Sequence, residues 1–257
     1  MALKILLVNK FYYPRGGDCV VMMNTESLLL SAGYEVAVYA MQYPETVDSP
    51  YKKYFASEVK FAGGLGEKVN GLKRTLGMGD ITESFTKLLD DFQPDVVHLH
   101  NIHSYLSPVL GQIAHSRGIR VVWTLHDCWS FTGHCTHFDF IGCDRWKSGC
   151  HDCPQLMAYP RSLFVDRTSR NYELKRELFT SLGDRLTLVP VSHWLEELVK
   201  ESFFKGTAVQ TIYNGIDTNV FCPRGNKPAR DYVLGVASPW CERKGFNDFI
   251  ALRSELP

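Results

Sequence analysis

The sequence has no excess of either charge and no long hydrophobic run. Its 257 residues include 28 Lys and Arg and 28 Asp and Glu, so the formal net charge at pH 7 is zero and the pI is about 7.1. A surface without net positive charge argues against nonspecific binding of nucleic acid, which we therefore do not expect as a partner. No stretch approaches the ~18 consecutive apolar residues that a membrane-spanning helix needs.

The sequence also lacks a secretory signal, the GxGxxG dinucleotide fingerprint and a Walker lysine. The apolar run in the N-terminal MALKILLVN is too short for the core of a signal peptide. We therefore expect a cytoplasmic protein, either free or held at the inner face of the membrane. In that compartment the eight cysteines are expected to be reduced or metal-bound rather than paired in disulfides.

Short apolar runs alternate with helical patterns along most of the chain. Strands are predicted at Leu3–Val8, Glu35–Met41, Asp95–His100, Ile119–Leu125, Leu186–Val191 and Val209–Tyr213. Helices are predicted at residues 18–32, 80–91, 108–117, 169–182 and 193–203. Strands separated by helices form parallel sheets with helices on both faces. We therefore predict an α/β fold built on a doubly wound, Rossmann-like parallel sheet.

A linker is predicted near the C-terminal end. Residues 222–230 are rich in Pro, Gly and charge, after which Tyr232–Ala237 predicts a strand and Gly245–Leu256 a helix. This last piece is shorter than the ~40 residues that fold alone. We predict one domain over residues 1–221 and, at residues 231–257, the truncated start of a second domain.

Polar residues follow most of the predicted strands, and ligands of doubly wound sheets bind beyond the carboxyl ends of the strands. His126 and Asp127 follow the run IRVVWTL and suit acid/base work or hydrogen bonding to a polar substrate. Gly16 and Gly17 follow the first strand. They either let a phosphate approach backbone N–H groups at a helix start or form a plain turn.

The histidines raise a second hypothesis, a metal-dependent hydrolase. His98 and His100 share one face of a strand, and with His126 and Asp127 they form a candidate metal site. The HxHxxH pattern lacks an obvious carboxylate to complete it. Two strand-end histidines, one packed and one lining a cleft, are therefore favoured.

Residues 128–153 predict a cysteine-dense loop. The pattern ends in CxxC, which suits tetrahedral zinc held by thiolates, although free cysteines packed with aromatic residues such as Trp146 explain it equally well. Such a zinc would be structural. Its ligands would be Cys135, Cys143, Cys150 and Cys153.

The motifs together resemble the family-four retaining glycosyltransferases of the GT-B fold. They are Gly16-Gly17, DVVHLHN at 95–101, TLHD at 124–127, Val191-Ser192, NGID at 214–217 with Phe221, and RKG at 243–245. The loop HDCWSFTGHC…GC…GCHDCPQ is similar to that of bacterial members that build exopolysaccharide, capsule and O-antigen chains. The resemblance covers the whole chain, as the N-terminal domain and the start of the C-terminal domain.

The resemblance implies transfer of a sugar from a nucleotide-diphosphate-sugar to a growing surface polysaccharide or lipid-linked acceptor. It implies retention at the anomeric carbon and no catalytic metal or other cofactor. The catalytic residues would be His126 and Asp127. The donor would be held by Gly16, Gly17, Asn214, Gly215, Arg243 and Lys244, and the acceptor cleft would include His100, Asn101 and Ser192.

Two departures from the family pattern affect these expectations. Ser238 stands six residues before Lys244, where the family commonly has an arginine, and Arg243 is the candidate substitute. The family's glutamate pair would lie beyond residue 257, so we expect this chain alone to be inactive.

Two further contacts are expected. The strand Tyr232–Ala237, lacking its sheet, is expected either to pack against the first domain or to pair with the same strand of a second copy, giving a homodimer. A basic segment beside apolar residues suggests peripheral membrane contact, although a solvated face is the simpler account. Its basic residues are Lys52, Lys53, Lys68, Lys73 and Arg74.

Overall fold

The structure is a computed structural model of the full chain. It describes residues 2–59, 80–103, 105–158, 166–223, 225, 232–237 and 240–255. Contacts divide the chain into two units, Met1–Gly215 and Ile216–Pro257, which are described separately. The division after Gly215 falls slightly before residue 221, the predicted end of the first domain.

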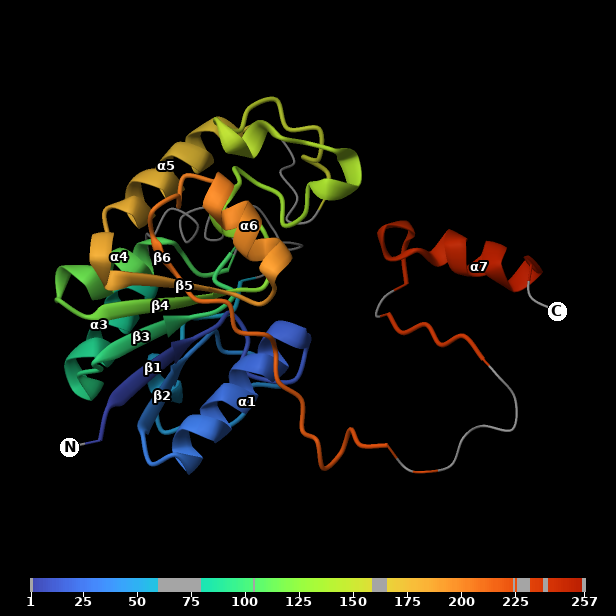
Figure 1. The fold of residues 1–257 in the computed structure, drawn as a ribbon. Helices are drawn as coiled ribbons and strands as arrows, with labels where there is room; N and C mark the ends of the chain where they lie inside the picture. Colours follow the sequence, from blue (N-terminus) through green and yellow to red (C-terminus); the bar gives the residue numbers. More distant parts are fainter. Residues whose placement is uncertain are drawn as a thin grey trace. The chain divides into compact units, whose positions relative to one another are not determined.

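A six-stranded sheet, parallel throughout, forms the centre of the first unit (Figure 1). The strand order is β2-β1-β3-β4-β5-β6. The strands are β1 Lys4–Val8, β2 Glu35–Tyr39, β3 Val96–Leu99, β4 Arg120–Leu125, β5 Leu186–Pro190 and β6 Ala208–Val209. The predicted α/β fold class, a doubly wound Rossmann-like sheet, is confirmed.

Helices cover both faces of this sheet. They are α1 Gly17–Ser31, α3 Asp80–Phe92, α4 Val109–Ser116, α5 Thr168–Thr180 and α6 His193–Glu201. In Figure 1, α1 and α6 lie in front of the sheet, with α3 and α4 behind it. Successive side chains of a strand point to opposite faces. Leu6 and Val8 of β1 accordingly join the core that includes α3 and α4, while Ile5 and Leu7 pack in a second core with Met22 of α1.

The strand order reverses between β1 and β3, and a buried asparagine ties the two strand ends together. The Asn9 side chain accepts a hydrogen bond from the Asn101 N–H at 3.0 Å and donates one to the Phe11 carbonyl at 2.9 Å. The Lys10 N–H donates to the Asn101 carbonyl at 2.9 Å. Because ligands bind at such a reversal, this tie holds the edge where the site is expected.

The last strand of the sheet is shorter than predicted. The sequence predicted Val209–Tyr213, whereas β6 covers Ala208–Val209. Its ladder continues through two further hydrogen bonds, from the Gln210 N–H to Leu188 at 2.9 Å and from the Ile212 N–H to Pro190 at 3.1 Å. Pro190 has no N–H to return, so regular pairing stops there.

In the second unit the predicted strand is wrong and the predicted helix is right. Residues 232–237 have no strand pairing in the described part of the chain, and Leu234 and Val236 are exposed. A strand needs a hydrogen-bonded neighbour, and none is described in this unit. The expected homodimer depended on a strand at residues 232–237, and the structure does not show that strand. Helix α7, Phe246–Glu255, follows a 3-10 turn at Glu242–Lys244.

The basic segment lies mostly outside the described residues, as do Ser238 and most of the predicted linker. Lys52 and Lys53 fall in a 3-10 turn, Lys52–Tyr54. The Lys53 ammonium lies over the Tyr54 ring, 4.8 Å from its centroid, and 3.9 Å from an Asp91 carboxylate oxygen. None of the described helices combines the length and apolar character that crossing a membrane requires.

The cysteine-rich loop between β4 and α5 is held by aromatic packing. Phe131, Phe138 and Trp146 are buried in a core that is continuous with the main one. The Phe138 and Trp146 rings stack with centroids 4.8 Å apart, and the Phe131 and Trp146 rings lie 5.4 Å apart. The Trp146 indole N–H donates to the Cys143 carbonyl at 3.1 Å. Buried aromatic rings thus supply the packing that a loop with only short 3-10 turns lacks.

Gly133 is a position in this loop where a side chain has no room. A Cβ there would lie 2.3 Å from the Thr168 carbonyl oxygen and 2.7 Å from Cys150 Cβ. We predict that Gly133→Ala lowers the free energy of unfolding by about 1–3 kcal/mol, as overpacking does. Urea denaturation measures this. Gly215→Ala, where no atom lies within 4 Å, is the control. Equal stabilities of the two variants would contradict the prediction.

Candidate functional site

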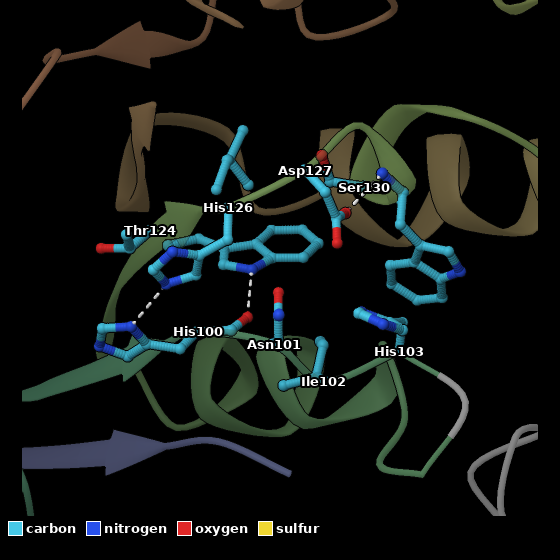
Figure 2. Close-up of a pocket in the computed structure, with 11 residues that line it drawn as sticks. His100, Asn101, Ile102, His103, Thr124, His126, Asp127 and Ser130 are labelled. Atoms are coloured by element: carbon cyan, nitrogen blue, oxygen red, sulfur yellow. Dashed lines mark hydrogen bonds between the residues drawn. The ribbon is translucent and has the colours of Figure 1, made fainter. Parts of the chain in front are cut away.

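The carboxyl ends of β3 and β4 open into a small hollow (Figure 2). It is lined by His100, Asn101, Ile102, His103, Trp123, Thr124, Leu125, His126, Asp127, Trp129 and Ser130. In the β3–β4 register His98 lies beside Val122, so the residues that follow the two strands emerge next to one another. The structure therefore brings together four residues that the sequence singled out at separate strand ends. They are His100, Asn101, His126 and Asp127.

Three imidazoles stack beside this hollow. The ring centroids of His98 and His100 are 4.5 Å apart, and those of His100 and His126 are 5.4 Å apart. His100 Nδ1 lies 3.1 Å from His126 Nε2, and His98 Nε2 lies 2.8 Å from Thr124 Oγ1. The Trp123 indole N–H donates to the His100 carbonyl at 2.9 Å (Figure 2).

Burial keeps these imidazoles neutral near pH 7. Loss of hydration lowers the pKa of His98 to about 4 and the pKa of His126 to about 4. The pKa of His100 is also well below its usual value, through burial and then through its two histidine neighbours. The rings therefore act as hydrogen-bonding groups and not as cations.

Asp127 is the acidic member of the hollow. Burial raises its pKa to about 6, opposed by the Trp129 N–H and then by the positive charges of Lys10 and Lys175. The Trp129 N–H donates to Asp127 Oδ1 at 2.9 Å, so the carboxylate also caps the first turn of the cysteine-rich loop. Asp127 is mainly ionised at pH 7 and serves both the local fold and the hollow.

Two lysines were missed by the sequence reasoning. Lys10 Nζ lies 3.0 Å from His103 Nε2, and both residues are buried. Burial lowers the pKa of Lys10, opposed first by Asp18 and then by Asp127. Lys10 is the second residue after β1, and His126 directly follows β4, so the strand-end rule was the signal that could have found Lys10.

The second missed lysine is Lys175 of α5, which is 2% exposed. Its ammonium donates to the Trp129 carbonyl and lies 3.9 Å from the centroid of the Trp129 ring. Burial lowers the pKa of Lys175 to about 7, opposed by Cys150, Cys135 and Asp127. The sequence signal was its place between Tyr172 and Phe179 on the buried stripe of the helix.

Two buried polar atoms at the hollow have no hydrogen-bond partner among the described residues. They are His100 Nε2 and Ser130 Oγ. His100 is 1% exposed and Ser130 is 2% exposed. Buried polar atoms are usually paired, so these two indicate a place where a ligand or ordered water supplies the missing partner.

A sequence model of glycosyltransferase family 4 matches residues 16–220. The chain belongs to this family. It is 33% identical over 149 residues to a protein of Escherichia coli K12 assigned as the colanic acid biosynthesis glycosyl transferase WcaC, covering 54% of this chain and 35% of that protein. It is 26% identical over 266 residues to an uncharacterized 42.6 kDa protein in the cps region of Klebsiella pneumoniae, covering 97% of this chain and 65% of that protein. The chain thus spans less than two thirds of the length of these relatives.

Solved structures resemble this chain loosely. A UDP-GlcNAc 2-epimerase from Methanocaldococcus jannaschii has a TM-score of 0.40 at 12% identity, covering 83% of this chain and 46% of that chain. A ugt transferase from Siraitia grosvenorii in complex with UDP has a TM-score of 0.39 at 14% identity, covering 81% of this chain and 50% of that chain. Structural similarity with TM-scores this low gives no information about the functional site.

The remaining predicted site residues lie outside the lining of the hollow. Gly16 is the N-cap residue of α1 and Gly17 its first residue, where backbone N–H groups favour an anion. Asp18 follows in the first turn, and its charge opposes that attraction. Ser192 caps α6, its hydroxyl accepting from the Leu195 N–H at 3.2 Å.

Two predicted donor contacts lie toward the C-terminal end of the chain. Asn214 and Gly215 are exposed at the end of the first unit. Arg243 and Lys244 are exposed in a 3-10 turn of the second unit, which ends at Gly245 with a φ of 72°. They are described within that unit alone.

The eight cysteines, all within the described residues, form no disulfides. Cys150 Sγ accepts a hydrogen bond from the Gly133 N–H at 3.1 Å. Burial, and then the neighbouring Cys153, Cys150 and Cys143, together raise the pKa of Cys135 to about 12. No three His, Cys, Asp or Glu side chains in the described ranges are arranged to hold a metal ion. The hydrolase alternative therefore finds no support, and zinc in the loop stays a prediction.

Metal analysis of protein purified without added metal tests the zinc prediction. We expect close to one zinc per chain, because four thiolates suit tetrahedral zinc. Cys150→Ser should lower the zinc content, whereas Cys222→Ser, an exposed cysteine outside the loop, is the control. A metal-free chain with four reactive thiols in an ordered loop would refute the prediction.

Acid should destabilise the protein between about pH 6.5 and 4. His98 and His126 have folded pKa values of about 4 against a usual 6.5, so in this range the unfolded chain binds more protons. Each then contributes a slope of up to ~1.4 kcal/mol per pH unit, with stability rising as pH rises. The pKa of Asp127 is raised from 3.8 to about 6, so the protonation of this one group has the opposite effect on stability. The net effect is a loss of stability as pH falls.

Urea unfolding at several pH values measures this slope. His98→Gln should flatten it, because one titrating imidazole is removed. Thr124→Val removes the hydroxyl 2.8 Å from His98 Nε2 but no titratable group, so the slope should remain. A His98→Gln protein with the original slope would disprove the assignment.

Proposed function

We propose that this chain supplies the acceptor-binding half of a GT-B transferase. The enzyme would move a sugar from a nucleotide-diphosphate-sugar to a surface polysaccharide or lipid-linked acceptor, with retention and without a catalytic metal. Family membership supports glycosyl transfer. The relatives' descriptions, colanic acid biosynthesis and a cps region, favour a polysaccharide product.

The observation that carries the proposal is the hollow with its unpaired polar atoms. His100 Nε2 and Ser130 Oγ are buried without a hydrogen-bond partner in the described part of the chain, and neutral His126 lines the same hollow. A sugar presents hydroxyl groups that both donate and accept, so it can satisfy such atoms. A site built to hydrogen-bond hydroxyls also rejects analogues that lack them, because its polar groups are then left unpaired.

Charge is distributed in a way that suits cleavage of a glycosyl–phosphate bond. In the transfer, the bond from the anomeric carbon to the diphosphate oxygen breaks, with the electron pair leaving on the nucleoside diphosphate. A bond to the acceptor oxygen forms, and the hydroxyl proton passes to the leaving diphosphate oxygen. Ionised Asp127 in the hollow would stabilise positive charge at the anomeric carbon. The backbone N–H groups of Gly16 and Gly17 would meet the diphosphate.

The second unit would contribute the opposite charge. Arg243 and Lys244 are adjacent cations that would stabilise the leaving diphosphate once a complete nucleotide-binding domain aims them. We propose that turnover needs that complete domain, because a charge without a fixed position gives little stabilisation of a transition state.

The test is a screen of nucleotide-diphosphate-sugars with a protein in which residues 1–221 continue into a complete nucleotide-binding domain. Transfer to a polysaccharide or lipid-linked acceptor that survives a metal chelator supports the proposal. Loss of transfer on chelation contradicts a metal-free reaction. Comparable turnover by the 257-residue chain alone would refute the division of roles between the domains.

In that assay His126→Ala should lower turnover by about 10²-fold or more, as loss of an acid/base or transition-state contact does. Its melting temperature should change little, because a ring at the edge of a hollow leaves no core cavity. His193→Ala, at an exposed position on α6, is the matched control and should keep its activity. Unchanged turnover in His126→Ala would remove His126 from the reaction.

A further inference from the structure

We infer that His100 is a positioning residue that holds His126 in one tautomer, with the proton on Nδ1, so that His126 presents an N–H donor to the ligand. The inference rests on the proposed function for the identity of that ligand, a sugar oxygen. It assigns to His100 a positioning role in addition to the acceptor contact expected from the sequence.

The position of the His100 ring is set by its neighbours. The ring is buried, with His98 stacked on it at 4.5 Å and an angle of 29° between the planes. The backbone carbonyl of His100 accepts the Trp123 indole N–H at 2.9 Å. His100 Nδ1 is thereby held 3.1 Å from His126 Nε2, within hydrogen-bond distance (Figure 2).

One proton is shared across this contact. Burial keeps both rings neutral near pH 7. A neutral imidazole has one N–H donor and one bare acceptor nitrogen, so one ring donates and the other accepts. If His126 Nε2–H donates, His100 carries its own proton on Nε2. If His100 Nδ1–H donates, His100 Nε2 carries no proton and has a free lone pair.

The surroundings of His100 Nε2 decide between these arrangements. This atom is buried and has no hydrogen-bond partner among the described residues. Buried N–H groups without an acceptor are rarer in proteins than acceptors with unused lone pairs. The arrangement with a bare Nε2 is therefore favoured. In it His100 Nδ1–H donates, His126 Nε2 accepts, and the His126 proton resides on Nδ1.

This assignment determines what His126 offers to the hollow. His126 lines the hollow, and its Nδ1 makes no hydrogen bond to the described residues. The free position thus carries an N–H donor and matches an oxygen acceptor, such as a sugar hydroxyl or ring oxygen. A neutral Nδ1–H donor does not take a proton from the acceptor hydroxyl.

Nuclear magnetic resonance of the full chain labelled with ¹⁵N-histidine tests the inference. Protonated and bare ring nitrogens have distinct ¹⁵N shifts, and the nine histidines can be assigned by single substitutions. At pH 7 we expect His126 to be protonated on Nδ1. In His100→Leu the population should shift toward Nε2–H, the tautomer that a free histidine side chain favours in water.

His100→Asn is the matched control. Its amide N–H lies close to the position of Nδ1–H and should restore the Nδ1–H tautomer of His126. Circular dichroism and thermal melting check that each variant folds. If His100→Leu does not fold, the wild-type and His100→Asn spectra still decide the tautomer.

Two results would overturn the inference. One is a wild-type His126 protonated on Nε2, and the other is an unchanged Nδ1–H tautomer in a folded His100→Leu protein. In the transfer assay, His100→Leu should lower activity by about 10- to 100-fold, with recovery in His100→Asn. An Nδ1–H tautomer at His126, together with no sugar transfer by the protein that carries the complete nucleotide-binding domain, would refute the proposed function and leave the tautomer assignment standing.

Discussion

Burial of both faces of a parallel sheet leaves this protein few places for polar side chains. Leu6 and Val8 pack on one face of β1 while Ile5 and Leu7 pack on the other, so a functional group within the strand would lose its hydration. The carboxyl ends are where the backbone leaves the sheet and polar groups find partners. Asn9 holds two of these ends in register through the Asn101 N–H, and the hollow forms beside them.

The same burial determines the chemistry at those ends. Imidazoles that would titrate near neutral pH are held neutral, and the pKa of Lys175 falls to about 7. Asp127 keeps its negative charge at pH 7 because the Trp129 N–H and nearby lysines oppose the cost of burial. A neutral, hydrogen-bonding site with one carboxylate is suited to a substrate made of hydroxyl groups.

The cysteine-rich loop forms part of the wall of the hollow, and it also contains buried aromatic residues that pack against one another. Its first turn includes Trp129 and Ser130, which line the hollow, and its aromatic core anchors that turn. Lys175 reaches from α5 to the Trp129 carbonyl and lies against the same indole ring. Changes in the loop core are therefore coupled to the hollow through contiguous contacts.

Particular residues show where sequence reasoning succeeded and where it failed. The strand ending at Leu125 and the cap at Ser192 were predicted, because apolar periodicity and capping depend on neighbours in the chain. The strand at residues 232–237 was wrong, because a strand also needs a partner that local pattern does not supply. Lys175 was missed, because its burial comes from a loop that is distant in sequence.

The sequence by itself determined the order of strands and helices and the candidate residues at the strand ends, since these follow from local periodicity and turn chemistry. The tertiary structure alone decided that His100 and His126 share a hydrogen bond, that His100 Nε2 is left unpaired, and that Lys10 is buried against His103. The physical reason is that burial and hydrogen-bond partners are supplied by segments far apart in the chain.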